Sequence, residues 1–355
     1  MQQPLVEKAR EMGLRTICFA WAEGAVCKDL CDRFYPVSVT EKEEILRICR
    51  EERIDGVCTI ASDVAAPTVA YVAEQMGLTG NPYEASLRAN NKYLMRQALK
   101  NAGVDCPEFM CVREEVRELG IRELGNERVR ELGNERVREL GIRGMELPLI
   151  VKPSDRSGSL AVTKVEKREE LEAAVREAQE VSFKGEAMVE EFIEGREISV
   201  EMISRRGVHY ALQITDKVTT EAPHFVELEH HQPSTLPAAM QEQIFAITRR
   251  ALDALGLTNG ASHSEYKITR EGRIVVMEIG GRMGGDFIGS HLVQLSTGYD
   301  FLRGVIEVAL GETIHPQPKP IGRSSVIFTA PENVSCSAER TGYCIYQNDK
   351  LVIKE

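Results

Sequence analysis

Ser264-Glu-Tyr-Lys-Ile-Thr269, Arg270-Glu-Gly-Arg273 and Ile274-Val-Val-Met-Glu-Ile279 follow one another in the chain and predict a β-hairpin. Both flanks are rich in β-branched and aromatic residues, and Glu271-Gly272 supplies the turn. A turn symmetric about this dipeptide places Glu265 directly opposite Glu278, and Tyr266 opposite Met277. Directly opposed residues have Cβ atoms roughly 5 Å apart, so two like charges there repel. A divalent cation shared by both carboxylates would offset the repulsion, and such cations often bind substrate phosphates as well.

Two solvated surface glutamates are the alternative interpretation of this hairpin, and a one-residue bulge would undo the match. The next stretch favours a ligand site. Gly280-Gly-Arg-Met-Gly-Gly285 holds one arginine among glycines, and glycines let a backbone approach a ligand closely. Arg282 adds a planar fork suited to a phosphate or a carboxylate. The glycine spacing differs from that of the dinucleotide-binding fingerprint. Together these features indicate phosphoryl chemistry.

Composition limits the class of protein. The 355 residues are 43% hydrophobic, which suits two or three compact domains. The net charge of −11 argues against a nucleic acid or an anionic membrane surface as the main partner. No apolar run approaches the length of a membrane span, and the first residues lack a signal-peptide pattern. Nine cysteines without a CxxC pair or a zinc spacing are typical of reduced thiols, so we expect a cytoplasmic protein.

Residues 1–88 alternate helix and strand signals and predict a small βαβ-type domain with a parallel sheet. Strands are expected at Arg15-Thr-Ile-Cys-Phe-Ala20 and Gly56-Val-Cys-Thr-Ile60, among helices at 4–12, 42–52 and 65–76. A doubly wound unit normally opens on a strand, whereas this chain opens on a helix. We therefore expect the first strand of the unit to be missing.

The predicted organisation has two further parts, a larger one at 89–312 and a short β-rich segment at 313–355. Within the larger part, 113–144 is interpreted as an insertion, because Asn126-Glu-Arg-Val-Arg-Glu-Leu-Gly133 is repeated without change at 134–141. An eight-residue period is not a heptad, and a glycine in each unit weakens a helix. Repeat expansion tolerated at the surface and a partner-binding segment are both open interpretations.

Lys152 is a candidate phosphate ligand because it ends an apolar strand and precedes a serine- and glycine-rich loop. A lysine there can hold phosphate oxygens while the backbone N–H groups of Ser157, Gly158 and Ser159 cover them. A surface lysine beside an ordinary turn is the alternative. Lys92, near the start of a predicted helix, is a weaker candidate of the same kind.

A nucleoside pocket is suggested by Glu190-Glu-Phe-Ile193 together with Glu197. The backbone of an extended segment could contact an adenine edge, and the later carboxylate could accept hydrogen bonds from ribose hydroxyls. An acidic hairpin without a ligand is the alternative.

The order of these pieces resembles the ATP-grasp superfamily. The matching segments are Asn91-Lys-Tyr-Leu-Met-Arg96, Ile150-Val-Lys-Pro153 with its loop, Val189 to Glu197, His263-Ser-Glu265 and Glu278 to Arg282. The closest resemblance is to carboxylate–amine ligases that include the L-amino acid (dipeptide) ligases, where Glu-x-x-x-Arg replaces the Glu-x-Asn of many relatives. This chain has Gly280 at the asparagine position and Arg282 at the arginine position.

The resemblance implies an α/β fold: a Rossmann-like pre-ATP-grasp domain, then a two-lobed ATP-grasp domain of α+β type with a lid at 148–195. It also implies roles for individual residues. Lys92 and Lys152 would bind the ATP phosphates, Glu190 and the Ile193 backbone would contact adenine, and Glu197 would bind ribose. Glu265 and Glu278 would bind Mg²⁺ (or Mn²⁺). The substrate would be bound by Glu227, His230 and Arg282. Arg282, Lys152 and Glu278 would be the catalytic residues.

The implied activity is an ATP-dependent carboxylate–amine ligase that forms an acyl phosphate and releases ADP and phosphate. Its substrates would be a small carboxylic acid and an amine, with amino acids expected, and homodimers are common in the superfamily. A bicarbonate- or formate-activating enzyme and a non-catalytic ATP-binding protein remain alternatives. A zinc hydrolase is disfavoured, because His263-x-Glu265 lacks the cysteine pair of zinc deaminases and no HExxH motif is present.

Overall fold

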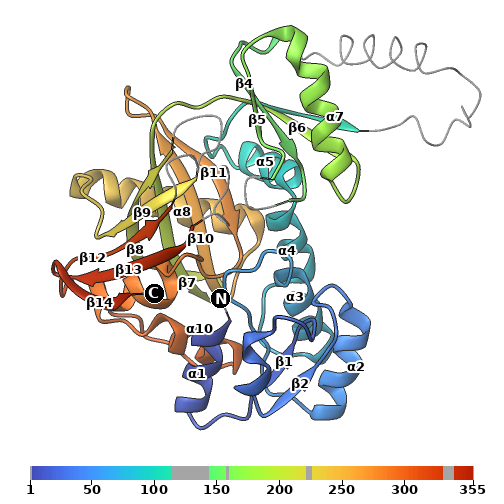
Figure 1. Cartoon of the computed structure of the whole chain (residues 1–355), viewed down its shortest axis with the longest axis vertical. Coiled ribbons are helices and arrows are strands. Elements are labelled where there is room, and N and C mark those ends of the chain that lie inside the picture. The colour runs from blue at the N-terminus through green and yellow to red at the C-terminus, as the bar shows by residue number, and fades with distance from the viewer. Residues whose placement is uncertain (1, 114–143, 157–159, 221–225, 331–339, 355) are drawn as a thin grey trace, which may run out of the picture.

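The computed structural model describes residues 2–113, 144–156, 160–220, 226–330 and 340–354. The repeats at 126–141 and the loop residues Ser157, Gly158 and Ser159 lie outside these ranges. The described chain forms an N-terminal part, a small four-stranded sheet and a large eight-stranded sheet (Figure 1). The predicted α/β class is therefore confirmed. No helix in the described ranges is both long and apolar enough to cross a membrane.

The N-terminal part contains a parallel pair of strands surrounded by helices. Its elements are α1 (Gln3–Glu11), β1 (Ile17–Phe19), β2 (Arg33–Tyr35), α2 (Lys42–Glu52), α3 (Ala66–Met76) and α4 (Tyr83–Asn90). Helices α1, α2 and α3 agree with the predicted ones to within a residue, but α4 and β2 were not predicted. The strand predicted at 56–60 is wrong, since only Ile60 makes an isolated parallel bridge, to Met283. The Gln2 side chain forms hydrogen bonds with both the backbone N–H and the backbone C=O of Ile60, as a neighbouring strand would.

The small sheet has the antiparallel order β3-β6-β4-β5, and it lies at the top of Figure 1. Its strands are β3 (Phe109–Arg113), β4 (Leu149–Pro153), β5 (Thr163–Val165) and β6 (Glu186–Glu191), and α7 (Leu171–Val181) covers one face. Leu149 and Val189 pack against Leu171 and Val175 of that helix. The sheet and α7 therefore form a lobe with its own apolar core.

The large sheet is antiparallel throughout, with the order β11-β10-β7-β8-β9-β12-β13-β14. Its strands are β7 (Arg196–Arg205), β8 (Val208–Thr219), β9 (Glu227–Gln232), β10 (Gly260–Ile268), β11 (Ile274–Gly280), β12 (Ser324–Thr329), β13 (Gly342–Gln347) and β14 (Lys350–Lys354). The β-rich segment predicted after residue 312 does contain strands. They extend this sheet beyond β9.

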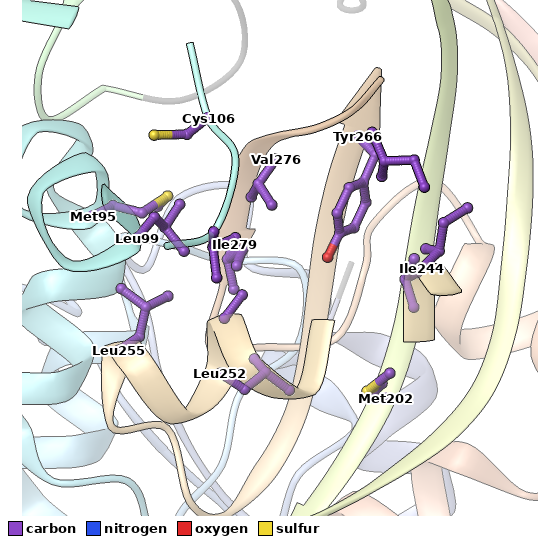
Figure 2. Close-up of a cluster of buried hydrophobic side chains, with 14 of the residues drawn as sticks. Met95, Leu99, Cys106, Met202, Ile244, Leu252, Leu255, Tyr266, Val276 and Ile279 are labelled. Carbon is purple, nitrogen blue, oxygen red and sulfur yellow. The ribbon is translucent and has the colours of Figure 1, made fainter. Parts of the chain in front are cut away.

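One face of the large sheet packs against α5 (Lys92–Asn101) and α8 (Ala238–Leu255), and Figure 2 shows this core. Successive strand residues point to opposite faces, so Met202 and Tyr266 enter the core while their neighbours Glu201 and Glu265 face the other way. The apolar positions Ile244, Ala251, Leu252 and Leu255 form the buried stripe of α8. The two-residue period of the strands thus places the acidic side chains on the face opposite the core.

The hairpin of β10 and β11 pairs Glu265 with Glu278, as predicted, but not through a symmetric turn. A three-residue loop, 270–272, ends at Gly272 with φ 85° and shifts the register by one residue. Tyr266 therefore pairs with Val276, and the predicted pair with Met277 is wrong. A bulge between Glu265 and Tyr266 then restores the pairing of the two glutamates.

Candidate functional site

A cavity of about 1180 Å³ lies among the small sheet, the acidic face of the large sheet and the N-terminal part. It is large enough for a nucleotide together with a small substrate. The predicted residues that line it are Lys92, Lys152, Ile193, Glu197, Glu227, Glu265, Glu278 and Arg282. Two other predicted residues, Glu190 and His230, are buried outside the lining. The structure therefore brings most of the candidate residues to one cavity.

The opposed carboxylates of Glu265 and Glu278 each contact a lysine. Lys217 Nζ lies 3.0 Å from Glu265 Oε1, and Lys92 Nζ lies 3.2 Å from Glu278 Oε1. Burial would raise the pKa of Glu265, but Lys217 and His263 outweigh it and hold that pKa well below its usual range. The contacts of Glu265 with Lys217 and His263, and of Glu278 with Lys92, all use Oε1. Two neighbouring carboxylates that leave Oε2 outside these contacts fit a hard divalent cation.

Lys152 is paired beneath the cavity with a buried carboxylate. Its Nζ lies 2.6 Å from Glu190 Oε2, and Arg96 Nε lies 2.8 Å from Glu190 Oε1. Burial raises the pKa of Glu190, but the two cations outweigh it and lower that pKa to about 2. The Glu190 side chain is 1% exposed, so its carboxylate anchors the lysine and is not presented to a ligand. Burial lowers the pKa of Lys152, an effect that Glu190 opposes.

Lys92, the first residue of α5, contacts the segment that leads into the serine- and glycine-rich loop. The Asn91 side chain caps α5 by accepting a hydrogen bond from Leu94 N at 3.0 Å. Lys92 N donates to Ser154 O at 2.8 Å, and its Nζ donates to Arg156 O at 2.7 Å. The two candidate phosphate lysines therefore flank the segment that leads into Ser157–Ser159.

Arg282 makes a bidentate ion pair with Asp63, a residue that sequence reasoning missed. The pair has Nε–Oδ1 and Nη2–Oδ2 distances of 2.8 and 2.7 Å. Burial raises the pKa of Asp63, but Arg282 outweighs it, so that pKa is lowered. A Cβ on Gly280 would lie 3.2 Å from both Arg282 Cζ and Asp63 Oδ1. The glycine at the usual asparagine position therefore makes room for this pair.

A second polar cluster surrounds Glu227 and His230 of β9. His230 Nε2 lies 3.2 Å from Glu227 Oε2 and 3.8 Å from Asp286 Oδ2. Burial lowers the pKa of His230, but Asp286 and Glu227 outweigh it and raise that pKa. Lys217 pairs with Glu227, and Arg340 pairs with Asp286 through bonds of 2.8 and 2.9 Å.

The ligand atoms of Glu227, His230 and Asp286 lie within 4.8 Å of one another, a spacing that a metal ion could use. Lys217 and Arg340 form ion pairs with Glu227 and Asp286. The cluster is therefore an ion-paired polar group beside the cavity.

At the other end of the cavity, Phe192 and Ile193 follow β6, and Glu197 lies on β7. Lys267 Nζ lies 3.0 Å from Glu197 Oε1. Lys164 and Lys267 lie over the Phe192 ring at 4.6 and 5.6 Å from its centroid. An aromatic ring and a carboxylate thus lie close together here, and the nucleoside pocket stays a prediction.

The residues that sequence reasoning missed are Asp63, Arg96, Lys217, Glu201, His263 as a partner of Glu265, Asp286 and Arg340. Most lie in segments distant in sequence from the residues they contact. A signal existed for Lys217, because Gln213, Thr215 and Lys217 are polar at a two-residue period, which indicates a polar face of the strand.

A comparison with protein families matches residues 145–290 to the ATP-grasp domain. The alanine–anticapsin ligase of Bacillus subtilis is 28% identical over 265 residues, which cover 68% of this chain. The chain spans about half (51%) of the length of that relative. The D-alanine–D-alanine ligase of Geobacter sulfurreducens is 27% identical over 266 residues, which cover 72% of this chain and 76% of that ligase.

Solved structures share the architecture. The L-amino acid ligase of Bacillus licheniformis superposes with a TM-score of 0.76 at 25% identity, covering 93% of this chain and 77% of the ligase. The biotin carboxylase domain of Hydrogenobacter thermophilus 2-oxoglutarate carboxylase, solved with MgADP and bicarbonate, gives a TM-score of 0.72 at 18% identity, with 91% and 71% covered. The family match, the distant ligase relatives and the shared fold agree with the resemblance seen in the sequence motifs. Residues 145–290 of the chain therefore belong to an ATP-grasp domain, and the chain as a whole shares the fold of ATP-grasp ligases.

Proposed function

We propose that this protein is an ATP-dependent carboxylate–amine ligase whose substrates are amino acids. The observation that carries the proposal is the composition of one cavity. Opposed carboxylates, Glu265 and Glu278, line the cavity with two lysines suited to phosphates, and Arg282 lines the same cavity. Enzymes of this superfamily bind ATP with Mg²⁺. The amino-acid ligases among the relatives favour amino acids as substrates.

In the proposed reaction, a carboxylate oxygen of the first substrate attacks the γ-phosphorus of ATP, and ADP leaves. The amine of the second substrate then attacks the acyl phosphate carbon, phosphate leaves, and the nitrogen loses a proton to give the amide. Lys92 and Lys152 would neutralise phosphate charge. Glu265 and Glu278 would hold Mg²⁺, which when bound spreads the charge of the transferred phosphoryl group.

The remaining roles follow from position in the cavity. Glu197 would accept hydrogen bonds from ribose, and the Ile193 backbone would contact adenine. Arg282 would orient the acyl phosphate, with Asp63 fixing the plane of its guanidinium. Glu227 would bind the amino-acid substrate, and buried His230 would support it. We also propose a domain division of 1–88 (pre-ATP-grasp), 89–312 (ATP-grasp, with a lid at 148–195 that excludes water) and 313–355.

The experiment is a phosphate- and ADP-release assay with ATP, Mg²⁺ and pairs of L- and D-amino acids, with product masses measured. We expect phosphate release that depends on an amino acid, with one ADP per amide bond. Release with bicarbonate or formate alone would move the assignment to the carboxyl-activating enzymes of the superfamily. ATP binding without turnover on every substrate would overturn the ligase proposal in favour of a non-catalytic protein.

A further inference from the structure

Two buried residues lie directly behind the candidate metal ligand Glu265. Glu201 of β7 and His263 of β10 are cross-strand partners, and the two-residue period puts His263 on the same face as Glu265. His263 Nδ1 donates to Glu201 Oε1, and His263 Nε2 lies 3.3 Å from Glu265 Oε1. Because both acceptors are carboxylates, the imidazole can satisfy both contacts only by donating from both nitrogens. The ring thus links a buried carboxylate to a partly exposed one.

Glu201 also fixes the glycine-rich loop. Its side chain is fully buried, and its Oε2 accepts a hydrogen bond from Gly284 N at 3.2 Å. A Cβ on Gly284 would lie 2.7 Å from His263 Nδ1 and 2.9 Å from Glu201 Oε1, closer than real Cβ atoms approach. The loop therefore passes this network only because residue 284 is glycine. The same loop carries Arg282 and Asp286, so one carboxylate couples the metal-ligand strand to the substrate side of the cavity.

We propose that Glu201 and His263 are positioning residues that fix Glu265 for metal binding and set the glycine loop against it. This inference rests on the proposed function, since it assumes a metal–nucleotide complex at Glu265 and Glu278. Lys217 holds the same oxygen of Glu265 from β8. The carboxylate is thereby held by two donors through Oε1, and Oε2 remains for a cation. Groups that orient a metal-binding carboxylate typically change metal affinity 10–100-fold when they are removed.

The test measures Mn²⁺ binding directly, by electron paramagnetic resonance of free Mn²⁺ in the presence of a non-hydrolysable ATP analogue. Glu201→Gln keeps the shape of the side chain but removes its charge, and His263→Gln removes the link to Glu265. We expect each variant to bind Mn²⁺–nucleotide about 10-fold more weakly, because Lys217 retains part of the orientation. Affinity for the metal-free nucleotide should change less than twofold, a separation that general structural damage would not produce.

The matched control is His209→Gln. His209 is another buried histidine of the large sheet, held by Ser204 at 2.7 Å and Asp253 at 3.1 Å, and it does not line the cavity. Its variant should lose stability but keep wild-type Mn²⁺ affinity. If the wild type binds Mn²⁺–nucleotide and both test variants bind it within twofold of that affinity, the positioning roles are overturned while the proposed function stands. If the wild type itself does not bind Mn²⁺ with the nucleotide, the proposed function fails first. Should Glu201→Gln not fold, His263→Gln carries the same comparison.

Discussion

Arg96→Met tests the buried charge cluster under the phosphate lysine. Arg96 is fully buried, pairs with Glu190, and donates from Nη2 to Met277 O at 2.6 Å. Lowering the pKa of Glu190 from 4.5 to about 2 corresponds to about 3 kcal/mol at about 1.4 kcal/mol per unit, shared between Arg96 and Lys152. The orphaned Met277 carbonyl adds about 1–3 kcal/mol. We therefore expect the variant to lose about 3 kcal/mol of unfolding free energy at pH 7.

The pH dependence follows from the direction of the shift. The folded pKa of Glu190 lies below its unfolded value, so its stabilisation is complete above about pH 4.5 and is lost as the pH falls toward 2. The difference between wild type and variant should therefore be constant from pH 7 to pH 5 and shrink at lower pH. Urea unfolding followed by circular dichroism measures it. The control Arg176→Met removes an exposed i,i+4 pair with Glu172 and should leave the midpoint unchanged. A loss below about 1 kcal/mol for Arg96→Met would refute the reasoning.

Three further substitutions address the candidate metal site, the turn before β7 and the core. Glu278→Gln should lower amino-acid-dependent phosphate release by on the order of 100-fold without changing the circular dichroism spectrum, and near wild-type turnover would exclude Glu278 as a metal ligand. Gly195→Ala places a Cβ 2.4 Å from Ile268 O, so it should lower the free energy of unfolding by about 1–3 kcal/mol. The control Gly144→Ala has open space around it and should not lower that free energy. Equal melting temperatures for the two variants would contradict the packing at Gly195. Tyr266→Phe removes a 2.7 Å hydrogen bond to the Thr248 hydroxyl, which itself donates to Ile244 O. The variant should lose about 1 kcal/mol of unfolding free energy in urea. No loss would show that this hydrogen bond does not stabilise the fold.

Helices and strands with a clear hydrophobic period could be predicted from the local sequence. The prediction was most useful at the hairpin of β10 and β11. The pairing of Glu265 with Glu278 was predicted from a symmetric turn, and the structure reaches the same pair through a longer loop and a compensating bulge. Two local deviations cancel there, which a turn rule cannot anticipate. The composition of residues 56–60 predicted a strand, but a strand needs a neighbouring strand to pair with. Here the side chain of Gln2 binds the backbone groups of Ile60 instead. Strand formation is thus decided by long-range pairing as well as by composition.

The candidate site divides in a similar way. Residues with a motif around them, such as Lys152 and Arg282, were found from the sequence. Their partners were missed, because Arg96 reaches Glu190 across 94 positions and Asp63 reaches Arg282 across 219. No local pattern records such a contact. The position of Glu190 shows the consequence: its sequence context suggested a ligand contact, whereas its carboxylate is enclosed by two cations.

An isotope measurement decides whether a carboxylate is activated as an acyl phosphate. The amino-acid substrate is supplied with both carboxylate oxygens as ¹⁸O, and the released phosphate is analysed by mass spectrometry. When the amine displaces the phosphoryl group from the acyl carbon, one carboxylate oxygen leaves with it. We expect one ¹⁸O in the phosphate for each amide bond formed. Phosphate without ¹⁸O, alongside amide product or ATP consumption, would contradict it.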